Sequence, residues 1–378
     1  MDGLRAIAVL AVVGSHAAKW ATTLHQGVWQ AVWSDGAHGV DLFFVLSGFC
    51  LSYPFLRAVR ERGFAAFSVP GYIARRIVRI VPPYYCAIAV LGAGIILCAD
   101  RGLGISFGDG TLHMSALDVL KQALFLDRQG IFINQSFWTL AIEWRWYFVF
   151  PLCLLLWTRS PRGFLALLIA CAAAAAGTHA GGYDLLAFPA FLLGIVAADL
   201  ELSGQPAARL SLMLLGLSLC LAVLLDPAYV LGYSLQQPIG WQLASFCLVL
   251  AAGNVPALRA ALSIRPLVWT GVASYSIYLV HEPIIELLAR NSHMGAVWAG
   301  VASVACGFGF WLACERWFVT APLKGKLTGW LHSPATTLLG RAGIPRSFVL
   351  SRSAGGGNDK GQGAHGASTE TELVQAGS

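Results

Sequence analysis

Charged residues are scarce in this sequence. Asp, Glu, Lys and Arg make up only 12% of its 378 residues, against roughly 25% in soluble domains. Hydrophobic residues make up 57%, and the mean hydropathy is +0.67. A soluble protein of this length needs a charged surface around its core, and this chain has too few charges to form one. The composition therefore excludes an ordinary soluble protein and predicts an integral membrane protein.

Paired cysteines are also lacking. The nine Cys residues form no CxxC pair and no spacing typical of a metal site. Nearly all lie in apolar runs, so we expect neither a disulfide framework nor a metal centre. The net charge of +6 does not indicate nucleic acid either. The Lys and Arg residues lie at the ends of apolar segments, where the positive-inside rule explains them, and we expect no nucleic-acid partner.

Long apolar segments recur along the chain and predict an all-α bundle of about ten transmembrane helices. The predicted spans are 4–22, 39–56, 80–99, 137–157, 164–178, 184–201, 210–226, 238–253, 267–289 and 296–319. We expect the first segment to be a membrane helix rather than a cleaved signal peptide, because it carries His16. The Arg-rich stretch 57–79 has isoleucines at helical spacing, which suits a segment along the membrane surface.

Basic residues divide unequally between the predicted loops. With a cytoplasmic N-terminus, thirteen Lys and Arg residues fall on the inner side and five on the outer side. This asymmetry predicts that both termini are cytoplasmic. We expect residues 1–325 to form the membrane domain. Residues 326–378 should form a cytoplasmic tail, mostly disordered because its end is rich in Gly, Ser and polar residues.

Titratable side chains inside apolar helices are costly and are therefore functional candidates. Arg5 and His16 are separated by ten residues, which sets His16 about 16 Å deeper along a helix. An imidazole there can take a proton from a hydroxyl. The alternative is an Arg that reaches the interface and a His that is only hydrogen-bonded to a neighbouring helix.

The inner run around Arg75, Arg76 and Arg79 gathers three guanidinium groups, with Arg75 and Arg79 on one helical face. Such a cluster suits a phosphate-bearing ligand through forked hydrogen bonds. It also suits a purely topological role, in which the arginines keep the loop inside and touch anionic lipid.

Glu143 lies in an aromatic-rich segment, and Arg145 points to a different side of the helix, so the two should not pair. We expect a His or Arg of another helix as the partner of Glu143. The alternative is a structural salt bridge between helices. Weaker candidates are His38 and Asp41, and the sequence His281-Glu282-Pro283. Asp41 could simply favour a helix N-terminus, and His281 could be only a structural hydrogen-bonder.

Five segments, taken together and in order, resemble the membrane-bound acyltransferase family 3. They are MDGLRAIAVLAVVGSHA (1–17), GVDLFFVLSGF (39–49), ARRIVRIVPPYY (74–85), SFWTLAIEWRWYFVFP (136–151) and SYSIYLVHEP (274–283), with ERW at 315–317 as a weaker match. The resemblance implies a bacterial inner-membrane enzyme of ten helices that transfers an acyl group, usually acetyl, from cytoplasmic acyl-CoA to a hydroxyl of a carbohydrate.

The resemblance also implies roles for particular residues. It makes His16 catalytic with Glu143, and it assigns Arg5, Arg75, Arg76 and Arg79 to the acyl-CoA. We expect the acceptor pocket to include Asp41, Ser47, Arg145, Tyr147 and His281. No bound cofactor or metal is expected, since acyl-CoA is a substrate, and the other partners are membrane lipid and the carbohydrate acceptor.

The chain departs from the family at Trp144, Arg145 and Trp146, where relatives usually have Glu, Gln and Phe. This difference bears on the acceptor pocket rather than on the chemistry. Some relatives carry an additional hydrolase-like domain, for which these 378 residues leave no room, so we expect any such domain on a separate protein.

The predicted mechanism has His16 as general base on the acceptor hydroxyl and Glu143 orienting its imidazole. The alternative function is a transporter or flippase for a glycan or lipid precursor, which would also bury His, Glu and Arg. The inner arginine cluster and the ordered motifs favour the acyltransferase. A non-catalytic scaffold would leave the buried polar groups unexplained.

Overall fold

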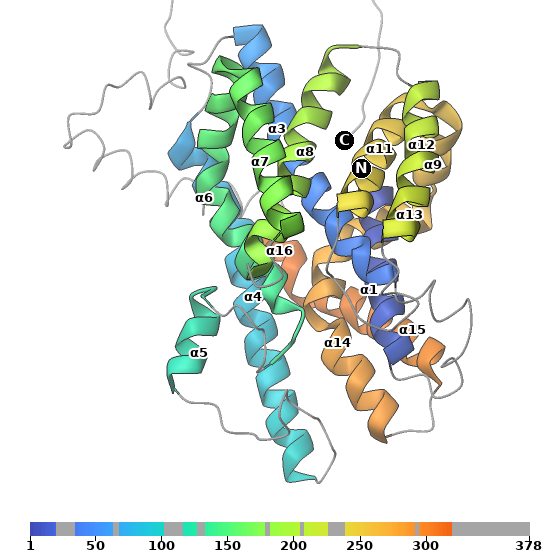
Figure 1. Ribbon diagram of the computed structural model, residues 1–378. Coiled ribbons are helices and arrows are strands. Elements are labelled where there is room, and N and C mark those ends of the chain that lie inside the picture. Colours follow the sequence, from blue (N-terminus) through green and yellow to red (C-terminus); the bar gives the residue numbers. More distant parts are fainter. Residues whose placement is uncertain are drawn as a thin grey trace, which may run out of the picture.

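The structure is a computed structural model. It describes residues 1–19, 35–62, 68–101, 116–126, 133–177, 182–204, 208–225, 239–291 and 295–319. Within these ranges all regular structure is helical and there is no strand (Figure 1), which confirms that the fold is all-α. The predicted tail at 326–378 lies outside the described residues.

Within the described residues, each predicted apolar segment is helical, and the segment 267–289 consists of two helices. The helices are α1 (Asp2–Lys19), α3 (Gly39–Arg62), α4 (Val69–Asp100), α5 (Ala116–Ala123), α6 (Phe137–Arg159), α7 (Pro161–Gly177), α8 (Gly182–Leu202), α9 (Ala208–Leu225), α11 (Ile239–Asn254), α12 (Pro256–Leu262), α13 (Arg265–Val272), α14 (Ser274–Asn291), α15 (Ala296–Phe310) and α16 (Arg316–Val319). A 3₁₀ turn, η1 (Asp35–His38), precedes α3, and a π-helical turn, η3 (Trp311–Glu315), joins α15 to α16.

Five of the described helical segments are long and apolar enough to cross a membrane. They are the segments around α3, α4, α6 and α8 and the continuous run from α15 to α16. The pair α11–α12, bent by 99°, could count as a sixth span, while α7 and α9 are apolar but shorter. By length and composition, the described part of the chain thus supports five or six crossings, fewer than the ten predicted.

Two predicted boundaries need correction. Helix α4 runs without interruption from Val69 to Asp100, so Arg75, Arg76 and Arg79 belong to the apolar helix itself and not to a separate surface segment at 57–79. The predicted span 267–289 is divided at Ala273 into α13 and α14. Gly271, near the end of α13, packs directly on the carbonyl of Asp2, where a Cβ would have no room.

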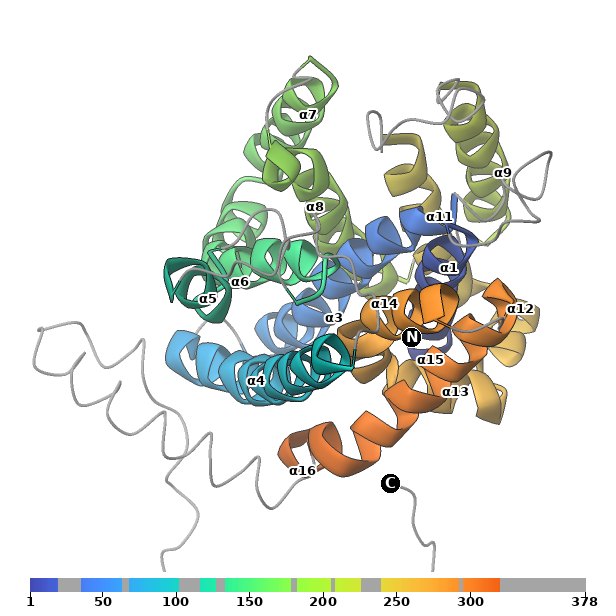
Figure 2. The same cartoon turned by 90° about the horizontal axis from the view of Figure 1, so that it is seen from below.

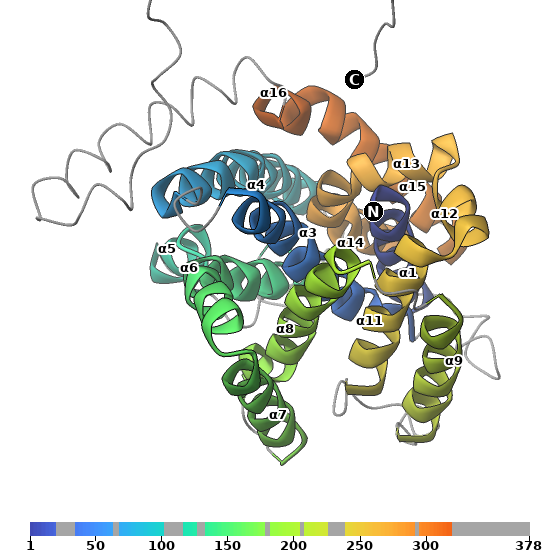
Figure 3. The ribbon, with the colours of Figure 1, turned by 90° about the horizontal axis from the view of Figure 1, so that it is seen from above.

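Helices α1 and α3 form the interior of the bundle. Helix α1 packs against α3, α13, α14 and α15, and α3 packs against α1, α6, α8 and α11. Figures 2 and 3, which look at the bundle from below and from above, both show α3 between α1 and the pair α4 and α6. Arg5 and His16 of α1 are therefore partly buried between helices, whereas Lys19 at the end of α1 is exposed.

Small residues bring α3 and α8 into close contact. A Cβ added at Gly48 would lie 2.1 Å from the carbonyl oxygen of Phe191, and one at Gly194 would lie 2.2 Å from that of Val45. Such glycine contacts are typical of helix packing in membranes, where close backbone approach replaces the hydrophobic driving force. This contact fixes α3, which carries Ser47 and Cys50.

Candidate active site

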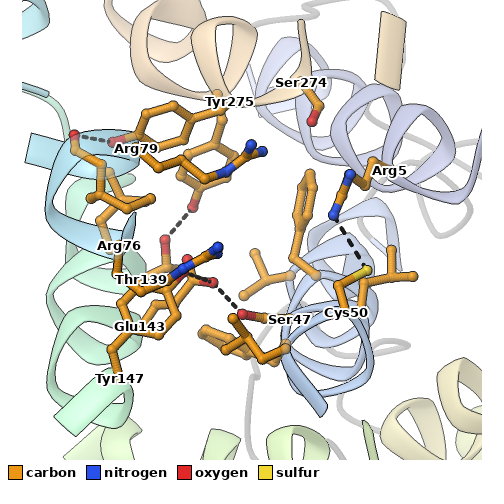
Figure 4. Close-up of a pocket in the computed structure, with 18 residues that line it drawn as sticks. Arg5, Ser47, Cys50, Arg76, Arg79, Thr139, Glu143, Tyr147, Ser274 and Tyr275 are labelled. Atoms are coloured by element: carbon orange, nitrogen blue, oxygen red, sulfur yellow. Dashed lines mark hydrogen bonds between the residues drawn. The ribbon is translucent and has the colours of Figure 1, made fainter. Parts of the chain in front are cut away.

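A pocket lined by arginines lies between α1, α3, α4, α6 and α14 (Figure 4). Arg5 of α1 lies across this pocket from Arg76 and Arg79 of α4. Glu143 is the one carboxylate among the described lining residues. The lining therefore carries more positive than negative charge, which favours an anionic ligand.

The guanidinium groups of the pocket differ in how they are held. Arg5 donates to Oδ1 of Asp2 at 2.7 Å and to Sγ of Cys50 at 3.3 Å. The buried Nε of Arg76 has no hydrogen-bond partner in the described part of the chain. Arg75 is exposed and is not among the lining residues. The predicted arginine cluster thus divides, and Arg76 and Arg79, three residues apart, share the pocket instead of Arg75 and Arg79.

Glu143 is held by hydroxyl groups. Ser47 of α3 donates to its Oε1 at 2.5 Å, and Tyr147, one turn further along α6, donates to the same atom at 2.7 Å. We expected a His or Arg partner, and neither of these bonds reaches His16. Ser47 and Tyr147, two of the predicted acceptor residues, line the arginine pocket together with Glu143.

His16 belongs to a second cluster, in which its partners come from α14. Its Nδ1 lies 2.9 Å from Nε2 of His281, and the two rings are nearly parallel, with centroids 5.0 Å apart. Oε2 of Glu282 lies 3.8 Å from the same Nδ1. The carboxylate beside His16 is therefore Glu282, which the sequence indicated only as part of the weaker candidate His281-Glu282-Pro283 and without a role.

A proline in α14 helps to build this second cluster. Pro283 has no N–H to donate to the carbonyl of Leu279, one helical turn earlier. The side chain of Asn134 donates to this carbonyl at 2.9 Å instead, and its own oxygen accepts the backbone N–H of Ser136 at 2.8 Å. Ser136 then donates its hydroxyl to Oε2 of Glu282 at 2.5 Å. The His-Glu-Pro sequence thus docks the start of α6 onto α14.

Tyr278 connects the two clusters. It lines the arginine pocket, and its ring centroid lies 5.4 Å from that of His281. Its hydroxyl shares a 2.6 Å hydrogen bond with Thr139, another lining residue, and donates to the carbonyl of Ser136 at 3.1 Å. One aromatic side chain therefore separates the arginine pocket from the pair of histidines.

Two predicted acceptor residues lie apart from both clusters. Asp41 is buried, 2.8 Å from Nδ1 of His38, and accepts a 3.3 Å hydrogen bond from Gln242. Arg145 pairs with Asp184 of α8 at 2.5 Å and donates to the carbonyl of Phe125 at 3.3 Å. Neither Asp41 nor Arg145 lines the pocket.

Glu315 is a further buried carboxylate that we did not predict as a site residue. It is 1% exposed, lies in the π-helical turn η3, and accepts hydrogen bonds from the N–H and hydroxyl of Ser276 at 3.2 and 2.6 Å. Single π-helical turns often occur at functional sites. The ERW motif was the sequence signal for this position.

Known proteins resemble the chain over its membrane part. A family model described as an acyltransferase domain matches residues 1–316. The chain is 26% identical over 178 residues to peptidoglycan O-acetyltransferase OatA of Listeria monocytogenes, covering 45% of this chain and 26% of OatA. It is 30% identical over 158 residues to acyltransferase MdmB of Streptomyces mycarofaciens, covering 40% of this chain and 38% of MdmB.

These alignments cover well under half of either relative, and no solved structure matches the chain. The family match is broader, since it takes in most of the chain and every cluster described above. The chain therefore belongs to the acyltransferase 3 family.

Proposed function

We propose that this protein is an O-acyltransferase that moves an acyl group, acetyl first among the candidates, from acyl-CoA to a hydroxyl of a carbohydrate. The observation that carries the proposal is the adjacency of the two clusters. An arginine-lined pocket suited to phosphate lies one tyrosine away from a buried histidine pair with a carboxylate beside it.

The donor would bind in the arginine pocket. Arg5, Arg76 and Arg79 present guanidinium groups from two helices, and guanidinium groups bind phosphate through charge-assisted hydrogen bonds. Arg75 would stay outside this contact. With the CoA phosphates held there, the pantetheine arm would extend past Thr139 and Tyr278 toward His16.

His16 would act as general base on the acceptor hydroxyl, which then attacks the thioester carbonyl. Glu282 would stabilise the imidazolium that forms, as the carboxylate does in a hydrolase triad. This assigns to Glu282 the role that the sequence suggested for Glu143. Glu143, with Ser47 and Tyr147, would instead help to shape the donor pocket.

The acceptor would be a cell-surface polysaccharide, an exopolysaccharide or a glycolipid. The relative OatA is named as a peptidoglycan O-acetyltransferase, which makes an amino-sugar polymer the first acceptor to test. We propose that the acceptor approaches His16 from the side opposite the arginine pocket. Because Asp41 and Arg145 lie apart from both clusters, the role we propose for them is limited to shaping the entrance for the acceptor.

We further propose ten crossings of a bacterial inner membrane with both termini cytoplasmic. The excess of basic residues in the predicted inner loops supports this orientation. Reporter fusions at Arg62 and Asp100, expected inside and outside respectively, would test it.

One observation favours the alternative of a transporter for a glycan or lipid precursor. The pair α11–α12 is bent by 99°, and broken helices are common at transporter binding sites. A transporter would move its cargo without consuming acyl-CoA, so an assay of acetyl transfer separates the two functions.

Membranes that contain the protein would be supplied with radiolabelled acetyl-CoA, and label entering the carbohydrate fraction would be compared between wild type and His16→Ala. We expect label only with wild type. Label that is equal in both would remove His16 from the mechanism. If folded protein gave no label with a panel of acyl-CoA donors and amino-sugar acceptors, the transporter would become the leading function.

A further inference from the structure

We propose that His281 is a positioning residue that holds His16 in the one tautomer able to act as a base toward the acceptor. This inference rests on the proposed function and refines it. It also gives His281 a different role from the acceptor contact that the sequence suggested.

Hydrogen-bond direction supplies the first step. Nδ1 of His281 lies 2.9 Å from the carbonyl oxygen of Tyr278. A carbonyl can only accept, so this nitrogen carries the proton. In a neutral imidazole the other nitrogen is then an acceptor, and Nε2 of His281 therefore presents a lone pair toward His16.

The same reasoning fixes the proton on His16. Its Nδ1 lies 2.9 Å from Nε2 of His281, so this bond forms only if His16 carries its proton on Nδ1. The lone pair of His16 is then on Nε2, directed away from His281. The tautomer of a catalytic His is commonly set in this way by the bond that its other nitrogen makes.

Burial and packing make His281 suited to this task. Its side chain is 0% exposed, and both ring nitrogens are engaged by protein atoms. No nitrogen is left to bind a sugar hydroxyl. The bond from Asn134 to the carbonyl that Pro283 leaves free fixes the helix around His281.

Glu282 completes the arrangement. Its Oε2, held by Ser136 at 2.5 Å, lies 3.8 Å from Nδ1 of His16. This distance is long for a hydrogen bond but short for attraction between charges. The carboxylate would therefore stabilise protonated His16 without displacing His281 from Nδ1.

The proton balance of the transfer then follows. The acceptor O–H proton passes to Nε2 of His16 while its oxygen bonds to the thioester carbonyl carbon. The carbon–sulfur bond breaks, and His16 returns the proton to the CoA thiolate. The products are an O-acyl ester and CoA, and His281 neither gains nor loses a proton.

Three substitutions at His281 would test this role. His281→Gln keeps an acceptor near the position of Nε2, His281→Asn keeps a polar group only near that of Nδ1, and His281→Leu keeps neither. The rate of label transfer from acetyl-CoA to the carbohydrate fraction would be measured at saturating and limiting acetyl-CoA. Ser303→Ala, which removes a buried hydroxyl that bonds within α15, is the matched control.

We expect the maximal rate to fall at least 30-fold in the Asn and Leu variants, with the KM for acetyl-CoA within twofold of wild type. The Gln variant should lie within about fivefold of wild type, and Ser303→Ala should be unchanged. If the Gln and Asn variants lost activity equally while keeping the thermal stability of wild type, the proposal would be overturned. A packing role of His281 would then explain the loss. If the Leu variant does not fold, the comparison of activity between the Gln and Asn variants tests the proposal.

An acceptor-binding role would give a different result. Activity would then fall through a higher KM for the carbohydrate, with the maximal rate retained, and this outcome would also overturn the proposal. Failure of the proposed function itself is distinguishable, because wild type and Ser303→Ala would then transfer no label.

Discussion

The two clusters of this protein use buried polar groups in opposite ways. In the arginine pocket, positive charge exceeds negative charge and the buried Nε of Arg76 lacks a hydrogen-bond partner within the described ranges. In the histidine cluster, Asn134, Ser136, Tyr278, His281 and Glu282 bond to one another or to backbone carbonyls. Uncompensated charge is suited to binding a ligand, whereas mutually bonded side chains are suited to holding one group in a fixed geometry.

The largest expected effect distinguishes the arginines that line the pocket from Arg75, which lies outside it. Arg76→Ala with Arg79→Ala should raise the KM for acetyl-CoA by about 100-fold or more, since each of the two charged hydrogen bonds contributes about 1.5–3 kcal/mol. Arg75→Ala should change it less than twofold, because Arg75 is exposed and does not line the pocket. If initial-rate assays gave the same KM change for the double variant and for Arg75→Ala, the arginines would have only the topological role.

A pair of carboxylate substitutions would sharpen the comparison. Glu282→Gln should lower kcat about tenfold, which corresponds to losing about 1.4 kcal/mol of charge stabilisation around His16 in the transition state. Glu143→Gln should mainly change the KM for acetyl-CoA, because Glu143 lines the donor pocket. If Glu143→Gln alone lowered kcat, the role suggested by the sequence would be restored to Glu143.

The anchor at Pro283 gives a smaller effect on stability. Asn134→Ala leaves the carbonyl of Leu279 without its donor, which should cost about 1–3 kcal/mol and lower the melting temperature in detergent. Adding Pro283→Ala restores a backbone N–H and should recover part of the loss. A double variant less stable than Asn134→Ala would contradict this account of the His-Glu-Pro sequence.

The smallest effect is a change in labelling at Cys50. Cys50 lines the pocket beside Arg5, so bound CoA should slow its alkylation by iodoacetamide several-fold, as measured by peptide mass spectrometry. Cys306 of α15, which is exposed and is not a lining residue, should react at an unchanged rate. Equal rates at Cys50 with and without CoA would argue against this pocket as the donor site.

Composition and the length of the apolar segments were sufficient to predict the long helices, because lipid requires backbone groups to be satisfied within each segment. The number of spans was harder to predict. Helix α14 carries Glu282, Glu286 and Arg290 within 18 residues, and the break before it lies beside the contact between Gly271 and Asp2. That contact arises between segments far apart in the sequence.

The residue types of the site could be predicted from the sequence, but which of these residues contact one another could not. His16, Arg76, Arg79 and Glu143 all lie in one of the two clusters. Helical spacing paired Arg75 with Arg79, yet the rotation of α4 in the bundle turns Arg76 and Arg79 inward. The sequence likewise offered Glu143 as partner of His16, and only the docking of α14 against α1 brings Glu282 there instead.

The most direct test of the division between the two clusters is a crossed measurement on purified protein. Equilibrium binding of acetyl-CoA and the rate of acetyl transfer would be measured for His16→Ala and for Arg76→Ala with Arg79→Ala. We predict that His16→Ala binds acetyl-CoA as wild type does but transfers no acetyl group, and that the double arginine variant loses binding yet recovers transfer at high acetyl-CoA concentration. If His16→Ala lost donor binding, or if the arginine variant stayed inactive at saturating donor, the two clusters would not have separate functions and the account would be wrong.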